Sequence, residues 1–240
     1  MSDSISLKCW IKSSDNYFAV SLFRVAKYLR YFNGPSIPWL YNFIYQLRSF
    51  LRILFSEFLR MFYYTPLFKS QLKSNPKKLL IYNGLPLILG NLDIKIGEDV
   101  RISAATTFAG RCVSKTPPLL QIGDNVDIGW QTGISVGSKI IIGNNVRIAG
   151  RSTLSGYPGH PVNAKKRALG LPEDDDQVGD IIIEDDVWLA TGVNVMANVR
   201  IGKGTIVACG SVVTKDLPAN VLAGGIPAKI IRHLTENDND

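Results

Sequence analysis

This chain of 240 residues has little cysteine, little histidine and no long apolar run, and these shortages exclude several classes of protein. Its three cysteines, Cys9, Cys112 and Cys209, are an odd number without the spacing of metal ligands, which predicts a reducing compartment. No apolar run reaches about 18 residues without a charge, so the sequence predicts no transmembrane helix. The first 15 residues lack the basic start and continuous apolar core of a secretory signal. We therefore expect a cytoplasmic protein.

The net charge of +7 leaves the class of partner open. Nucleic acid, a membrane surface and phosphorylated small molecules all attract a chain of this charge. The sequence has no base-stacking or groove-reading motif, so we expect no nucleic-acid partner.

The strongest positive signal is a spacing of six between aliphatic residues. It runs through Ile183, Leu189, Val195, Ile201, Val207 and Val213. Neither an α-helix nor a two-sided strand produces this spacing. It is typical of a parallel β-helix, in which six residues form one short strand and one turn of a triangular prism. Gly, Asn and Asp recur at the expected corners, at 123–125, 143–145 and 202–204, where the backbone needs unusual φ angles.

The same spacing divides the repeat into coils of three faces each. The triplets of inward residues begin at Ile96, Ile122, Ile142, Ile183 and Ile201. A triplet spans 18 residues, so starts that differ by 26, 20, 41 and 18 leave insertions of 8, 2, 23 and 0 residues. The insertion of 23 lies between Leu154 and Ile183, and so long an excursion is typical of a functional loop.

Three regions are expected: a helical, aromatic and basic N-terminal region with a linker at 1–90, the β-helix domain at 91–234 and a disordered tail at 235–240. Within the first region, 76–90 is expected to hold a linker and a first strand or cap of the prism. Aromatic and basic residues interleave at 23–32 and 47–64. Two interpretations stay open here. Either residues 17–65 contact the inner face of the cytoplasmic membrane as basic amphipathic helices, or they pack on the neighbouring domain with a solvated arginine face.

The long loop contains His160, one of only two histidines; the other is His233. Glycine and proline on both sides of His160 restrict the backbone, so the imidazole is expected at a definite place. Histidine is the side chain best suited to take a proton near neutral pH. The alternative is a surface histidine without a role.

Four stretches carry a family resemblance: GHP at 159–161, VWLATGV at 187–193, IVACGSVVTKDLP at 206–218 and AGGIPAKIIR at 223–232. With these motifs the chain resembles the hexapeptide-repeat acyltransferases, specifically the sugar O-acetyltransferases of the galactoside and maltose acetyltransferase type. The resemblance implies a left-handed parallel β-helix of about five coils with a long inserted loop. It also implies a homotrimer, with acyl-CoA bound in the groove between neighbouring prisms, acetyl-CoA as the donor and no metal.

The resemblance also assigns roles to residues. His160 serves as the general base, taking the proton of an acceptor hydroxyl that attacks the acetyl thioester directly. A backbone N–H near the Thr191 turn or in the opposing coil stabilises the oxyanion. The expected acyl-CoA contacts are Ala190 and Thr191 at the pantetheine arm, Ala208 and Cys209 one coil later, Thr214 and Lys215 near the adenine, and Lys229 and Arg232 near the phosphates. Cys209 replaces a small residue of the family and is expected as a small hydrophobe packed beside CoA, not as a nucleophile.

The acceptor side departs from the family. The Asn and Asp that contact the sugar in the galactoside and maltose enzymes correspond to positions near Gly129 and Gly137. The acceptor residues expected here are Trp130, Gln131 and Trp188. Trp130 either stacks on a sugar ring or belongs to an interface, and Trp188 points outward. The acidic run at 173–176 either pairs with the basic residues at 165–167 or is solvated.

The expected function is therefore acetyl transfer to a sugar hydroxyl in a polysaccharide or lipopolysaccharide precursor. A nucleotide-sugar N-acetyltransferase and a non-enzymatic β-helix scaffold are the alternatives. A γ-class carbonic anhydrase is excluded because it needs three zinc-ligating histidines, and the repeat contains only His160.

Overall fold

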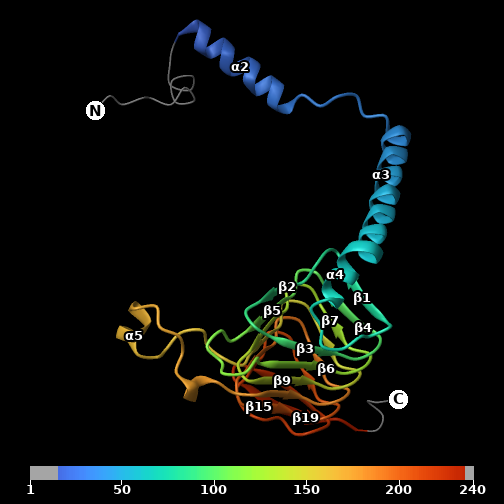
Figure 1. Cartoon of the computed structure of the whole chain (residues 1–240). Coiled ribbons are helices and arrows are strands. Elements are labelled where there is room, and N and C mark those ends of the chain that lie inside the picture. Colours follow the sequence, from blue (N-terminus) through green and yellow to red (C-terminus); the bar gives the residue numbers. More distant parts are fainter. Residues whose placement is uncertain (1–15, 236–240) are drawn as a thin grey trace. The chain divides into compact units, whose positions relative to one another are not determined.

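The computed structural model describes residues 16–235, and the chain divides into two units, Met1–Ile53 and Leu54–Asp240. Cys9 and nearly all of the predicted tail lie outside the described residues. Figure 1 shows the first unit as helices and the second as short strands wound into a stack.

The N-terminal region is helical over the two predicted stretches. Its elements are α2 (Tyr17–Tyr31), α3 (Pro38–Leu59), the π-helical turn η1 (Arg60–Tyr64) and α4 (Thr65–Lys69). Asn16 caps α2, its Oδ1 accepting a hydrogen bond from the amide of Phe18 at 2.9 Å. Pro38 opens α3, where a missing N–H costs nothing. Within the described part of the chain, no helix is both long and apolar enough to cross a bilayer.

The second unit consists of strands that follow one another around three sheets. Sheet 1 contains, in hydrogen-bonded order, β1 (Leu79–Tyr82), β4 (Val100–Ser103), β7 (Asp127–Ile128), β10 (Arg147–Ile148), β13 (Trp188–Leu189), β16 (Ile206–Val207), β18 (Val221–Gly225) and β19 (Ala228–His233). Sheet 2 contains β2 (Leu87–Leu89), β5 (Thr107–Gly110), β8 (Gly133–Val136), β11 (Thr153–Ser155), β14 (Asn194–Met196) and β17 (Val212–Val213). Sheet 3 contains β3 (Asp93–Ile96), β6 (Leu119–Ile122), β9 (Lys139–Ile142), β12 (Ile181–Ile183) and β15 (Val199–Ile201).

The register of these strands confirms the predicted repeat. On sheet 3, Ile96, Ile122, Ile142, Ile183 and Ile201 stand in register across parallel strands, and all five are buried. Sheets 1 and 2 stack the second and third residues of each triplet in the same way. Burial of these columns removes apolar side chains from water, which is the main stabilising term of such a core. The fold is the left-handed parallel β-helix that the resemblance implied.

Both ends of the stack are covered. A coil formed by β1 and β2 precedes Ile96, so the first strand begins at Leu79, inside the stretch expected to hold a linker and cap. Phe68 of α4 is buried against Phe108, with ring centroids 6.1 Å apart. At the other end, β19 turns back antiparallel to β18. These elements cover the terminal coils, which otherwise expose core and strand edges.

The corners of the prism hold the left-handed residues that the sequence predicts. We name each corner by the sheets it joins in chain order, the 1–2, 2–3 and 3–1 corners. At the 3–1 corner, Asn125, Asn145 and Gly204 have φ angles of 53°, 59° and 69°. The Asn125 amide donates to Asn145 Oδ1 at 2.9 Å, and the Asn145 amide donates to Asp186 Oδ1 at 2.8 Å. A ladder of side-chain hydrogen bonds therefore ties successive coils together at this corner.

Candidate active site

Six of the predicted site residues stack along the 1–2 corner. These are Trp130 and Gln131 after β7, Ala190 and Thr191 after β13, and Ala208 and Cys209 after β16. Backbone hydrogen bonds join the coils here, for example from Gly210 N to Thr191 O at 2.9 Å. The corner turns through residues with positive φ, including Gln131 at 55° and Gly210 at 67°.

After β13 and β16, this corner carries only small side chains. Ala190 and Ala208 are half-buried, while Thr191 and Cys209 are exposed. Cys209 is thus accessible in the single chain, and its expected packing beside CoA stays a prediction. A bulky side chain at Thr191 would therefore project into solvent at this corner.

The predicted basic pair lies on the strand that closes sheet 1. Lys229 and Arg232 belong to β19, where they stand opposite Gly224 and Leu222 of β18. Gly224 lies directly beside the corner, because a Cβ added there would come within 3.1 Å of Ala208 Cβ. The structure thus brings Lys229 to the same end of the corner as Ala208 and Cys209.

The two tryptophans of the acceptor side are both exposed to 48%. Trp188 on β13 points outward, as predicted from its place after the buried Val187. The guanidinium carbon of Arg151 lies 4.7 Å from the ring centroid of Trp130, a cation–π contact. Arg151 therefore lies over one face of the Trp130 ring.

His160 and the pair Thr214–Lys215 lie at the 2–3 corner, at the opposite end of the sheet 2 strands. The insertion that carries His160 spans residues 156–180, between β11 and β12. Figure 1 shows it leaving the stack, with α5 (Ala164–Ala168) standing away from the strands. Thr214 and Lys215 follow β17 and are exposed. One chain therefore does not place His160 beside Ala190 and Thr191.

The backbone around His160 is held in place. Gly159 has a φ of 79°, which a side chain would strain, and Pro161 is buried. Arg167 Nη1 donates to the carbonyl oxygens of Pro161 and Val162, both at 2.9 Å. The His160 side chain itself is exposed and makes no hydrogen bond within residues 16–235. A fixed backbone thus presents a free imidazole.

The imidazole faces a hollow of about 380 Å³ between two insertions. It is lined by Cys112 and Val113 from the loop at 111–118 and by Tyr157, Gly159, His160, Gly170, Leu171, Pro172 and Glu173 from the long loop. Burial raises the pKa of the Tyr157 hydroxyl, with smaller contributions from Cys112 and Glu173. Its hydroxyl therefore stays protonated at neutral pH and is able to donate a hydrogen bond.

A buried ion pair joins the two insertions. Arg111 Nε donates to Glu173 Oε1 at 2.5 Å, and its Nη2 donates to the Glu173 carbonyl oxygen at 3.2 Å. Arg111 Nη1 lies 2.8 Å from Asp175 Oδ1. Burial alone lowers the pKa of Arg111, but the hydrogen bonds to Glu173 and Asp175 outweigh it and raise that pKa. Arg111 is therefore charged and anchors the loop that carries His160.

The sequence missed this anchor. It predicted that the acidic run pairs with residues 165–167 or is solvated, and only the contact of Lys166 with Asp174, at 2.7 Å, follows the first alternative. Glu173 is buried instead. The one available signal was the insertion of eight residues after Phe108, which places Arg111 at the base of the long loop.

No group of three His, Cys, Asp or Glu side chains within residues 16–235 could hold a metal ion.

Packing explains the glycine at position 137, because a Cβ there would lie 2.4 Å from the Gly156 carbonyl oxygen. Gly137 thus lies under the long loop and has no room for a side chain.

Residues 180–215 match the family of bacterial transferase hexapeptide repeats (six repeats). The matched segment of the β-helix, from β12 to β17, thus consists of hexapeptide repeats. The chain is similar to galactoside O-acetyltransferase of Escherichia coli, with 35% identity over 123 residues, or 50% of this chain and 56% of that enzyme. A shorter match is to 2,3,4,5-tetrahydropyridine-2,6-dicarboxylate N-acetyltransferase of Clostridium perfringens, with 49% identity over 59 residues, or 25% of each chain.

The chain thus spans about half the length, or less, of these curated relatives. Among solved structures, the N-acyltransferase AntD of Bacillus cereus, in complex with dTDP and 3-hydroxybutyryl-CoA, aligns with a TM-score of 0.56 and 18% identity. The alignment covers 72% of this chain and 89% of AntD. An identity of 18% shows that the β-helix shares its fold with AntD, and no more than the fold.

Proposed function

We propose that the chain is an acetyl-CoA-dependent O-acetyltransferase with His160 as its general base. The acceptor is a sugar hydroxyl in a polysaccharide or lipopolysaccharide precursor. The observation that carries the proposal is the exposed imidazole of His160, held by Gly159, Pro161 and Arg167 at the edge of a hollow. The name of the Escherichia coli relative, a galactoside O-acetyltransferase, supports an oxygen acceptor.

In this proposal the chain's residues bind the acyl donor and move one proton. Ala190, Thr191, Ala208 and Cys209 leave room for a thin pantetheine arm, and the cationic side chains of Lys229 and Arg232 suit phosphate oxygens. The imidazole of His160 takes the proton of the acceptor hydroxyl as its oxygen attacks the thioester carbonyl. The C–S bond then breaks, the leaving thiolate receives that proton, and the products are the acetyl ester and free CoA.

The positions of these groups support a homotrimer. His160 and the proposed acyl-donor site at Ala190 and Thr191 lie at opposite ends of the sheet 2 strands of one chain. A site that needs both is complete only when the 2–3 corner of one prism faces the 1–2 corner of another. Three prisms around a threefold axis form three such grooves.

Replacement of His160 by alanine tests the proposal. We expect turnover of a sugar acceptor to fall at least about a hundredfold, the usual contribution of a general base, with CoA binding unchanged. His233→Ala, the matched change at the other histidine, should retain turnover. Near-normal turnover of His160→Ala would remove this residue from the mechanism. If the wild-type chain does not bind CoA in a thermal-shift assay, the non-enzymatic scaffold is favoured instead.

A second candidate is transfer to an amine of a nucleotide sugar. The 49% identity over 59 residues to an N-acetyltransferase, whose named substrate is a dicarboxylate, supports a nitrogen acceptor but not the nucleotide sugar itself. An amide product survives mild alkali and an ester does not, so the stability of the acetylated product distinguishes the two.

A further inference from the structure

The helix α3 carries an apolar face that no described residue covers. Residues at helical spacing place one side chain after another on this face: Leu40, Phe43, Ile44, Leu47, Phe50, Leu51, Leu54, Phe55 and Phe58. None of the residues of α3 is buried, and Phe43 and Phe55 are exposed to 62% and 64%. An uncovered apolar surface of this extent marks an interaction site.

A second stripe of α3, directly beside the apolar face, is basic and rich in tyrosine. Arg48 and Arg52 lie on it together with Tyr41 and Tyr45, and Arg60 continues the same stripe into η1. The one acidic residue, Glu57, is neutralised by Arg60, whose Nη2 lies 2.6 Å from Glu57 Oε2. The net charge of α3 and η1 is therefore positive.

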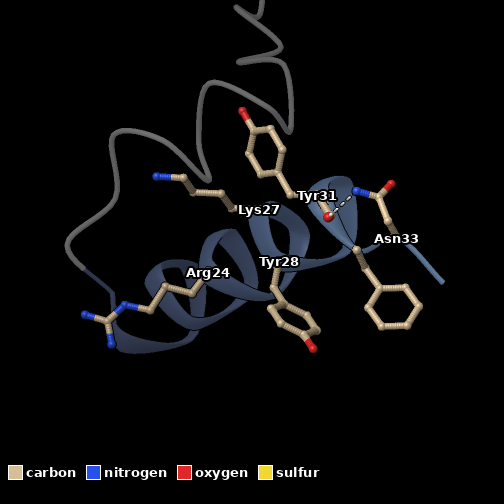
Figure 2. A pocket seen from close by; sticks show the side chains of 6 residues that line it. Arg24, Lys27, Tyr28, Tyr31 and Asn33 are labelled. Atoms are coloured by element: carbon tan, nitrogen blue, oxygen red, sulfur yellow. Dashed lines mark hydrogen bonds between the residues drawn. The ribbon is translucent and has the colours of Figure 1, made fainter. Parts of the chain in front are cut away.

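The helix α2 repeats this arrangement. Arg24, Lys27, Tyr28 and Tyr31 share one side at helical spacing and line a hollow of about 770 Å³. Figure 2 shows Tyr28 and Tyr31 pointing away from each other on this helix. Phe18, Leu22, Val25 and Leu29 occupy another side and are exposed. Two successive helices thus combine an apolar face with cationic and phenolic side chains.

We propose that α2 and α3 bind to the surface of an anionic lipid bilayer, with their apolar faces among the acyl chains. Arginine, lysine and tyrosine then lie at the level of the phosphate headgroups, where long cationic stems and phenol rings are best accommodated. A second copy of the chain fits this surface less well, because it would bring an equally basic face alongside. No described helix is apolar enough to span the bilayer, so the helices lie along its surface.

Binding to lipid does not depend on catalysis. We also propose that the bound enzyme acts on a lipid-linked glycan at the inner face of the cytoplasmic membrane. This second step rests on the proposed function. Acetyl transfer to a soluble oligosaccharide measures catalysis separately, so failure of one proposal leaves the other standing.

The test is co-sedimentation of the full chain with vesicles of phosphatidylcholine alone and of phosphatidylcholine mixed with phosphatidylglycerol. One variant, Leu47→Gln/Leu54→Gln, removes apolar contacts and keeps a good helix former. Another, Arg48→Ala/Arg52→Ala, removes two charges from the basic stripe. Its control, Lys77→Ala/Lys95→Ala, removes two exposed charges from the β-helix.

The wild-type chain should bind the mixed vesicles, and added salt should weaken this binding. We expect both helix variants to bind at least about tenfold more weakly, with the lysine control unchanged. Wild-type binding to neither kind of vesicle would overturn the proposal, and so would equal binding by Leu47→Gln/Leu54→Gln. A change of oligomeric state in that variant, without vesicle binding by the wild type, would assign the face to a second copy instead.

Discussion

Arg111 and Glu173 are 62 residues apart in the sequence, yet their charged atoms meet at 2.5 Å beneath the loop of His160. Removing one partner of a buried pair leaves an uncompensated charge, which costs about 3–5 kcal/mol. An exposed pair such as Lys166 with Asp174 contributes at most about 1 kcal/mol. The loop therefore depends on the buried pair.

We predict that Glu173→Gln opens the loop at 156–180. Amide hydrogen exchange of that loop should become at least about tenfold faster, because a loss of 1.4 kcal/mol already gives this factor. Turnover should fall as His160 loses its fixed position, while the strands of the β-helix keep their protection. Lys166→Ala is the control, and equal exchange in the two variants would contradict the role of the anchor.

Thr191 tests the proposed acyl-donor site at the 1–2 corner. Its side chain is exposed, so Thr191→Trp should fold normally and place bulk beside Ala190 and Ala208. We predict at least about a tenfold loss of CoA affinity by calorimetric titration, because the thin arm is then excluded. Lys95→Trp, on the outside of sheet 3, should bind CoA normally. Unchanged affinity of Thr191→Trp would place the donor elsewhere.

At the scale of elements, the 3–1 corner links stability to pH. Glu98 and Glu184 accept hydrogen bonds from backbone amides, Glu98 from Lys77 and Lys78 and Glu184 from Lys203. These bonds, with the Arg200 side chain as a further partner of Glu184, hold the pKa of both carboxyls below the ordinary 4.5. A carboxyl whose pKa is lowered by folding stabilises the fold at any pH above its ordinary pKa. This stabilisation is lost as the pH falls through the lowered pKa.

The double variant Glu98→Gln/Glu184→Gln should therefore lose less stability than the wild type between pH 5 and pH 3. Denaturant midpoints across this range measure the difference. Glu57→Gln changes a glutamate of α3 outside the β-helix and is the control. Parallel curves for wild type and double variant would contradict the linkage.

The sequence predicted most of the β-helix because its period is local. Each coil repeats an inward residue every six positions, and all fifteen expected inward residues from Ile96 to Val213 are buried. The corners followed from Gly, Asn and Asp at those places. The two ends of the β-helix were harder to predict, because β1 and β2 lack the full repeat and β19 runs antiparallel to β18.

The candidate site was predictable where motifs carry it and not where distant residues meet. His160 and the small residues at 190–191 and 208–209 lie in recognisable motifs. The contact of Arg111 with Glu173 depends on two insertions folding against each other, and no local pattern predicts which acid turns inward. The sequence likewise did not show that Arg151 covers one face of Trp130.

At the scale of the whole molecule, the proposed site is shared between chains. His160→Ala and Thr191→Trp are then defects on opposite sides of a groove. In randomly mixed trimers, about one groove in four combines an intact His160 with an intact Thr191. We predict that mixing the two inactive variants under exchange or co-expression restores up to about a quarter of wild-type turnover.

The control is each variant mixed with itself, which should stay inactive. No recovery in mixed trimers of confirmed composition would contradict a shared site. That result would require His160 and Thr191 of the same chain to act together. Their positions at different corners of the prism argue against this.

Intact-glycan mass spectrometry tests most directly whether the protein transfers an acetyl group to a sugar hydroxyl through His160. The comparison is a host strain with the wild-type protein, without it, and with His160→Ala. We predict that each glycan repeat loses the mass of one acetyl group in the last two strains, and that mild alkali removes this acetyl group from the wild type. Glycans of equal mass in all three strains would contradict the account, and a difference that survives alkali would move the acceptor to an amine.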